Sequence, residues 1–246
     1  MAKLRFVLVR PTHPGNIGAS ARALKTMGLR RLFLVAPHRY PSADATAMAA
    51  GAADVLHETV ICASPGEAVR GCTLVVGASA RNRSIPWPTV SAREGASRII
   101  EATARGEVAV LFGPEHSGLS NIEVELCQLL IKVPAAPECS SLNLAAAVQI
   151  VAYELRQTAI SHHATADLTI ERVATADEMA RFYLHLENAM IDAGFLDPEK
   201  PRRLMRRMRR LFNRARLDQN ELNILRGFLA AVQTKIKTKV PGELER

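Results

Sequence analysis

Apolar residues in the first two thirds of the chain gather into short runs that alternate with segments of helical character. The runs predict strands over residues 4–9, 31–36, 55–63, 74–77, 108–112 and 129–133. Capping and turn residues between them predict helices over residues 17–27, 42–50, 64–71, 91–105 and 140–156. Because strands and helices alternate and several strands are apolar on both faces, we expect an α/β domain with a mostly parallel sheet over residues 1–158.

The last third of the chain has a different pattern. Residues 159–175 are polar and rich in Ala, Thr and His, and we interpret them as a linker. A basic helical extension follows over residues 176–246, with helices predicted over residues 176–193, 198–214 and 218–237. The second domain is therefore expected to be small and entirely helical.

The middle helix of this extension is strongly basic. Its apolar residues recur at helical spacing and predict one packed face, made by Leu204, Met208, Leu211 and Ala215. No acidic residue interrupts its arginines, which are Arg202, Arg203, Arg206, Arg207, Arg209, Arg210, Arg214 and Arg216. The chain carries a formal charge of +8, so a polyanion is a reasonable partner, although a charge run can also be a merely solvated helix face.

Composition excludes several other classes of protein. Hydrophobic residues at 48% and charged residues at 23% are typical of a soluble globular chain. The four cysteines lack CxxC spacing, the N-terminus does not resemble a signal peptide, and no stretch of about 18 apolar residues predicts a membrane helix. We therefore expect reduced thiols, a cytoplasmic protein and no metal site. Neither a GxGxxG fingerprint nor a P-loop is present.

Three separate motifs carry the candidate chemistry. Asn16-Ile17-Gly18 leads on to Arg22, Phe112-Gly113-Pro114-Glu115 leads on to Gly118, and residues 140–145 (SSLNLA) open the last helix of the domain. The first two follow strand ends, where open α/β sheets bind their ligands. Taken singly, these polar residues are ordinary helix caps or surface groups, so only their joint occurrence is informative.

In this order and spacing, the three motifs resemble the SPOUT class of RNA methyltransferases, and within it the SpoU/TrmH branch of 2′-O-methyltransferases. Three longer segments, RPTHPGNIGASARALKTMGL, GASARNRSIPWP and RRLFNRARLDQNELNILRG, are similar to the TrmJ family. That family methylates the ribose of nucleotide 32, a cytidine or uridine, in the anticodon loop of tRNA. The resemblance covers nearly the whole chain and is weakest at residues 157–176 and in the last ten.

The resemblance implies a parallel sheet with a C-terminal trefoil knot, in which residues 140–156 pass under the loop at residues 78–83. It also implies S-adenosylmethionine as cofactor, tRNA as partner, and a homodimer whose active site is shared between subunits. The cofactor positions it implies are Ala78, Ser79, Ala80, Gly113, Val133, Ser140, Ser141 and Leu142. The RNA-binding positions we expect are Arg81, Arg83, Arg202, Arg203, Arg206, Arg207, Arg210 and Arg214.

The catalytic positions implied by the resemblance are Arg22, Asn16, Glu115, Ser141 and Asn143. A ribose hydroxyl is a poor nucleophile at neutral pH, so it must be oriented and partly deprotonated as it attacks. Because an arginine stays protonated, we expect Arg22 to hold a phosphate and stabilise the developing alkoxide rather than to act as a base. We expect the two asparagines to fix the loops and the ribose, with Glu115 and Ser141 hydrogen-bonding across the site.

Alternative interpretations stay open at this stage. Within the class, the substrate could be ribosomal RNA or another tRNA site. Outside it, the chain could be a non-catalytic RNA-binding protein with the same fold, or an enzyme acting on small nucleotides. His13 could act as a base, although we favour a role in stabilising its turn or contacting RNA, and Trp87 could stack on a base or simply pack its loop.

Overall fold

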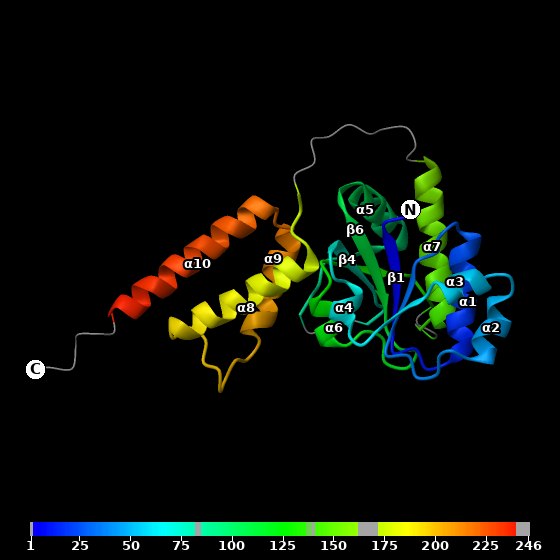
Figure 1. The fold of residues 1–246 in the computed structure, drawn as a ribbon, viewed down its shortest axis with the longest axis horizontal. Helices are drawn as coiled ribbons and strands as arrows, with labels where there is room; N and C mark the ends of the chain where they lie inside the picture. Colours follow the sequence, from blue (N-terminus) through cyan, green and yellow to red (C-terminus); the bar gives the residue numbers. More distant parts are fainter. Residues whose placement is uncertain (1, 82–84, 137, 139–140, 162–171, 240–246) are drawn as a thin grey trace, which may run out of the picture.

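The computed structural model describes residues 2–81, 85–136, 138, 141–161 and 172–239 (Figure 1). Seven strands form one sheet in the order β3-β2-β1-β6-β4-β7-β5, and every pair of neighbours is parallel. The strands are β1 (Leu4–Val9), β2 (Leu32–Val35), β3 (Val60–Cys62), β4 (Cys72–Ala78), β5 (Thr89–Ser91), β6 (Glu107–Phe112) and β7 (Leu129–Lys132). The predicted α/β class with a parallel sheet is therefore confirmed.

Helices connect the strands and continue beyond the sheet. Those of the α/β domain are α1 (Pro14–Thr26), α2 (Ala43–Ala49), α3 (Ala53–His57), α4 (Pro65–Ala68), α5 (Ala92–Arg105), α6 (Asn121–Glu125) and α7 (Leu144–Ser161). Three more follow: α8 (Ala176–Asp192), α9 (Leu204–Ala215) and α10 (Gln219–Lys239). None of the helices in the described ranges combines the length and apolar composition needed to cross a bilayer.

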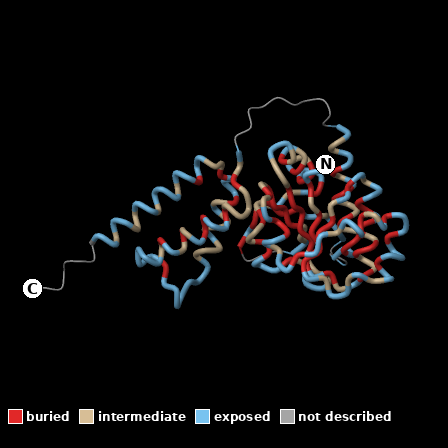
Figure 2. Tube along the Cα trace, viewed as in Figure 1, coloured by how far each residue is buried: buried red, intermediate tan, exposed pale blue. Residues whose placement is uncertain are grey.

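The sheet is buried on both faces because side chains alternate along each strand. On β1, Phe6 and Leu8 belong to a core shared with α1, α5 and α7, whereas Val7 and Val9 belong to a second core that includes residues of α4 and α6. Phe6 stacks on Phe112 of the neighbouring strand with ring centroids 5.8 Å apart. Figure 2 shows this buried centre and the largely exposed path of α10.

Some predicted element boundaries were wrong. The helix α3 occupies residues 53–57, the start of a predicted strand, because Val55 and Leu56 turn inward and leave only three residues for the strand β3. The short β5 and α6 were missed, although a capping box between Ser120 and Glu123 marks the start of α6. The helix α7 ends at Ser161, past the predicted end at residue 156, and α9 begins only at Leu204.

The predicted packing face of α9 was only partly right: Met208 packs against the core of the C-terminal helices, whereas Ala215 is exposed. Leu211 is 43% exposed, whereas Phe212 packs in a core with Phe182 and Tyr183 of α8. Asn213 is 3% exposed, and its amide nitrogen donates to the carbonyl oxygens of Glu125 and Cys127 at 3.1 and 3.2 Å. One buried residue on the inner face of α9 is therefore polar, and a search for regularly spaced apolar residues cannot find it.

This asparagine joins the C-terminal helices to the α/β domain. Its side-chain oxygen accepts a 2.6 Å hydrogen bond from the hydroxyl of Tyr183. The carbonyl of Cys127 also accepts from Nε1 of Trp87 at 2.9 Å, so Trp87, only 8% exposed, packs its loop in the present structure. Cys62, Cys72 and Cys127 are buried thiols that form no disulfide bond among the described residues, as expected, and Cys139 lies outside those residues.

We predict that Asn213→Leu lowers the free energy of unfolding by about 2–3 kcal/mol, because the carbonyls of Glu125 and Cys127 and the Tyr183 hydroxyl each lose one hydrogen bond. Urea denaturation measures this change. The matched variant Asn220→Leu, at an exposed position of α10, should stay within about 0.5 kcal/mol of wild type. Equal effects of the two substitutions would contradict the assigned role of Asn213.

Candidate active site

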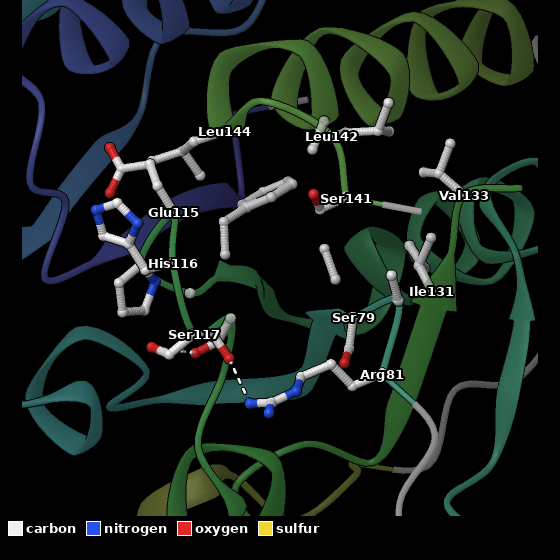
Figure 3. A pocket seen from close by; sticks show the side chains of 17 residues that line it. Ser79, Arg81, Glu115, His116, Ser117, Ile131, Val133, Ser141, Leu142 and Leu144 are labelled. Atoms are coloured by element: carbon white, nitrogen blue, oxygen red, sulfur yellow. Dashed lines mark hydrogen bonds between the residues drawn. The ribbon is translucent and has the colours of Figure 1, made fainter. Parts of the chain in front are cut away.

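The carboxyl ends of β4, β6 and β7 surround a cavity of about 300 Å³ (Figure 3). Its walls are largely apolar, with polar groups around the rim. The lining residues are Ala78, Ser79, Ala80, Arg81, Phe112, Gly113, Pro114, Glu115, His116, Ser117, Gly118, Ile131, Val133, Ser141, Leu142, Leu144 and Ala147. Every cofactor position expected from the sequence lines this cavity except Ser140, which lies outside the described residues.

The segment after β6 folds tightly back on itself beside the cavity. A Cβ atom on Gly113 would lie 2.1 Å from the carbonyl carbon of Gly118 and 2.2 Å from the nitrogen of Leu119. The amide of Gly118 donates to the carbonyl of Pro114 at 2.8 Å, and Gly118 has a φ of +61°. Only glycine fits at Gly113, because the opposing atoms belong to the main chain and cannot move aside.

Glu115 is held by hydrogen bonds from the loop between β1 and α1 and from the first turn of α1. Its carboxylate accepts from the amide and hydroxyl of Thr12 at 3.0 and 2.7 Å, from the amide of His13 at 3.2 Å, and from Nδ2 of Asn16 at 2.8 Å. Burial pushes the pKa of Glu115 upward, but the hydrogen bonds from Asn16 and Thr12 outweigh it and lower the pKa to about 2. Glu115 is therefore an anion at neutral pH and a poor proton acceptor.

Asn16 extends this network to the third motif. Its side-chain oxygen accepts a 2.9 Å hydrogen bond from Nδ2 of Asn143, whose own oxygen accepts from the amides of Ala145 and Ala146 at the start of α7. The expectation that Asn16 caps α1 was wrong: the helix begins at Pro14, so Asn16 lies in its first turn. The three sequence motifs thus meet in one hydrogen-bonded chain.

Comparison with known proteins identifies the family. Residues 3–153 match the family described as SpoU rRNA methylases, and residues 177–241 match the C-terminal domain of the tRNA methyltransferase TrmJ. The chain belongs to the SpoU methylase family. The resemblance seen in the sequence is confirmed, and the SpoU methylase is an RNA ribose methyltransferase as predicted.

Individual relatives support the same assignment. A Pseudomonas aeruginosa (strain UCBPP-PA14) protein named tRNA (cytidine/uridine/adenosine-2′-O-)-methyltransferase TrmJ is 46% identical over 241 residues, 94% of each chain. The crystal structure of TrmJ from Z. mobilis ZM4 superposes with a TM-score of 0.81 at 34% identity, covering 93% of this chain and 98% of that one. The SpoU methyltransferase AviRb from Streptomyces viridochromogenes, solved with AdoMet, gives a TM-score of 0.52 at 25% identity, covering 65% and 62%.

Arg22 stands apart from the cavity of this SpoU methylase. It is exposed on α1, does not line the cavity, and makes no hydrogen bond or ion pair with the described residues. It lies six residues beyond Asn16, or about 9 Å along the helix. Within one chain, the structure therefore brings Asn16, Glu115, Ser141 and Asn143 together but leaves Arg22 outside.

The predicted RNA-binding arginines fall into two groups. Arg202, Arg203, Arg207 and Arg214 are exposed, whereas Nε of Arg206 donates to the Glu125 carboxylate at 2.7 Å and its side chain is 19% exposed. Arg210 is half-buried, and its Nε has no hydrogen-bond partner among the described residues. Arg206 thus helps to dock α9 on the α/β domain through Glu125, and its predicted contact with RNA stays a prediction. Arg83 lies outside the described residues.

Sequence reasoning missed His116 and Ser117, which line the rim directly after Glu115. The ring of His116 meets that of His13 edge to face at 6.1 Å, while the His13 amide helps to hold Glu115. Nη1 of Arg81 donates to the carbonyl of Ser117 at 2.7 Å and so bridges two sides of the cavity (Figure 3). The position of His116 and Ser117 immediately after the Gly-Pro-Glu turn is the sequence feature that could have identified them.

We predict that Glu115→Gln destabilises the protein by about 1–2 kcal/mol at neutral pH, a modest value because the partly exposed carboxylate is screened by solvent. Since the pKa of Glu115 is lowered from 4.5 to about 2, its contribution is complete above pH 4.5 and is lost as the pH falls toward 2. Urea denaturation across this range should show the two proteins converging at low pH. Glu199→Gln, at an exposed site, serves as control, and a constant difference at every pH would contradict the assignment.

Proposed function

We propose that this SpoU methylase transfers a methyl group from S-adenosylmethionine to the ribose 2′-hydroxyl of nucleotide 32, a cytidine or uridine, in the anticodon loop of cytoplasmic tRNA. The observation that carries the proposal is the hydrogen-bonded chain Glu115–Asn16–Asn143, which draws three separate motifs around one cavity. The relatives named as tRNA 2′-O-methyltransferases support tRNA as the substrate.

The cavity fits the chemistry of the cofactor. S-adenosylmethionine would supply an electrophilic methyl group on a positively charged sulfur. A volume of about 300 Å³ lies at the lower end of the usual range for small-molecule sites. Phe112, Ile131 and Leu144 offer apolar walls for a purine, and the anionic Glu115 favours a cationic group nearby. The AdoMet complex of AviRb supports the same ligand.

Two further parts of the proposal concern chain topology and assembly. We propose that the segment leading into α7 passes beneath the loop after β4 as part of a trefoil knot; residues 141–142 and 78–81 lining one cavity support this threading. We also propose a homodimer in which Arg22 enters the partner's cavity. The exposure of Arg22 on α1, and of Tyr153 and Ile160 on α7 at 46% and 57%, supports an interface on this side.

In this proposal, each residue of the site has a separate role. Arg22 holds the phosphate beside the target ribose and stabilises the negative charge that develops on the 2′-oxygen, since a guanidinium remains protonated. Glu115 stays ionised and fully hydrogen-bonded, so it orders the loops rather than taking the proton. Asn16 and Asn143 keep the first turn of α1 against the start of α7, and Ser141 faces the cavity with its hydroxyl.

We expect Arg22→Ala to lower methyl transfer by about 100-fold or more, because it removes a charge that acts on the transition state. The measurement is transfer of labelled methyl to unmodified tRNA, with the product nucleotide mapped. Cofactor affinity should change little, and Arg39→Ala, at an exposed loop position, is the control.

The possible outcomes of this methyl-transfer assay distinguish the proposed function from its alternatives. Label at a ribose of the anticodon loop supports the proposal. Label elsewhere in tRNA, or only in ribosomal RNA, would overturn the assignment to nucleotide 32. Cofactor binding without any transfer would favour a non-catalytic RNA-binding protein.

We expect the triple variant Arg202→Gln, Arg203→Gln and Arg207→Gln to bind tRNA about 10- to 100-fold more weakly, with a shallower salt dependence, since each phosphate contact contributes about 0.7–0.9 to the slope. Binding across a salt series measures this, and cofactor affinity should not change. The charge-matched control carries Gln at Lys3, Arg39 and Arg70, which are exposed on the α/β domain. Equal losses of tRNA affinity in the two triple variants would instead show a general effect of net charge.

A further inference from the structure

A second cavity, of about 90 Å³, lies where α9 meets the amino ends of β4 and β7. Three arginines line it: Arg98 from α5, Arg214 from the last turn of α9, and Arg216 directly after that helix. The volume holds several water molecules, so it also has room for a phosphate group. The cavity exists only because α9 is docked on the α/β domain.

The positive charges here are not neutralised within the described parts of the chain. Arg214, Arg216 and the nearby Arg105 form no ion pair with a described residue, and Arg98 pairs only with the exposed Glu94 of its own helix. Partial burial, followed by the charges of Arg105 and Arg98, lowers the pKa of Arg216, and Glu101 acts in the opposite direction. Clustered guanidinium groups repel one another, and a bound anion would remove that repulsion.

The other polar side chains of the wall are already committed. The side-chain oxygen of Gln128 accepts from the amide of Val75 at 2.7 Å, and the Asn213 amide is bound to the carbonyls of Glu125 and Cys127. The guanidinium groups are therefore what the wall offers to a ligand. Arg216 also ends α9 in the left-handed conformation, with φ of 55°, which is unusual for a residue with a side chain.

We propose that this cavity is a phosphate-binding site that holds a backbone phosphate of the RNA substrate, far from the target nucleotide. Arginine forks bind phosphate oxygens in pairs, and a site built from two structural elements fixes the orientation of what it binds. The choice of RNA as the source of the phosphate rests on the proposed function.

The position of the site fits a role in affinity rather than chemistry. Leu74 borders this cavity and Ala78 borders the candidate active site, so the two lie toward opposite ends of β4. Four residues of strand separate them by about 13 Å. A polyanion with regularly spaced charges can contact both places, whereas a single small substrate cannot.

The test uses full-length Arg98→Gln, Arg216→Gln and the double variant, with Arg70→Gln as the matched control. In tRNA binding across a salt series, we expect each single variant to lose several-fold in affinity. The slope of log K against log salt should fall by about 1 for a lost phosphate contact. The KM for tRNA should rise while kcat and cofactor affinity stay unchanged.

Thermal stability separates ligand binding from a structural role. Because Arg216 faces like charges, Arg216→Gln should leave the Tm unchanged or raise it. A fall in Tm of several degrees together with an unchanged salt slope would show that the residue is structural and would overturn the proposal.

Inorganic phosphate distinguishes the two sources of the anion. If it raises the Tm of wild type but not of the double variant, while tRNA binding is the same in both, the site binds free phosphate and the RNA assignment is overturned. Suppose instead that wild type methylates tRNA, that the double variant keeps the full salt slope, and that phosphate does not change the Tm of either protein. The proposed phosphate site is then refuted, whereas the proposed function stands. A wild type that neither binds nor methylates tRNA overturns the proposed function and the RNA assignment together.

Discussion

The carboxylate of Glu115 is the centre on which the candidate active site depends. Four hydrogen bonds reach it, from Thr12 and His13 in the loop after β1 and from Asn16 in the first turn of α1, while Glu115 itself follows β6. Ionic hydrogen bonds are stronger than neutral ones, so the charge holds these two connections in register. Asn16 passes the constraint on to Asn143 and the start of α7. Loops from distant parts of the chain are thereby fixed around the cavity.

A second constraint acts on the other side of the sheet. The carbonyl of Cys127 accepts hydrogen bonds from Trp87 and Asn213, which come from the loop before β5 and from α9. Arg206 strengthens the same contact through Glu125. The C-terminal helices are therefore held against the sheet by specific polar bonds in addition to apolar packing. This leaves Arg207 and Arg214 of α9 facing solvent, where a polyanion can reach them.

These two constraints explain how the proposed chemistry is divided. The cavity combines apolar walls with polar groups that are already hydrogen-bonded, so it is suited to binding and orienting a ligand. The guanidinium of Arg81 lines the cavity and is bound to the carbonyl of Ser117, whereas Arg22 lies exposed on α1, outside the cavity of its own chain. Under the proposed function, the methyl donor and the guanidinium that acts on the ribose therefore belong to different protomers.

Local chemistry in the sequence determined most of the strands, their parallel arrangement, the caps at Ser42, Ser64 and Ser91, and the three motifs that form the cavity. These features depend on alternation and on short-range bonding, which neighbouring residues encode. Tertiary structure alone decided that Asn16 bonds Glu115 rather than capping α1, that Val55 is helical, and that Asn213 rather than Leu211 packs α9. For Asn16 and Asn213, a partner distant in the chain outweighs the local preference, because a buried polar group must find its hydrogen bond wherever the fold supplies one. Val55 instead follows its apolar side chain into the core.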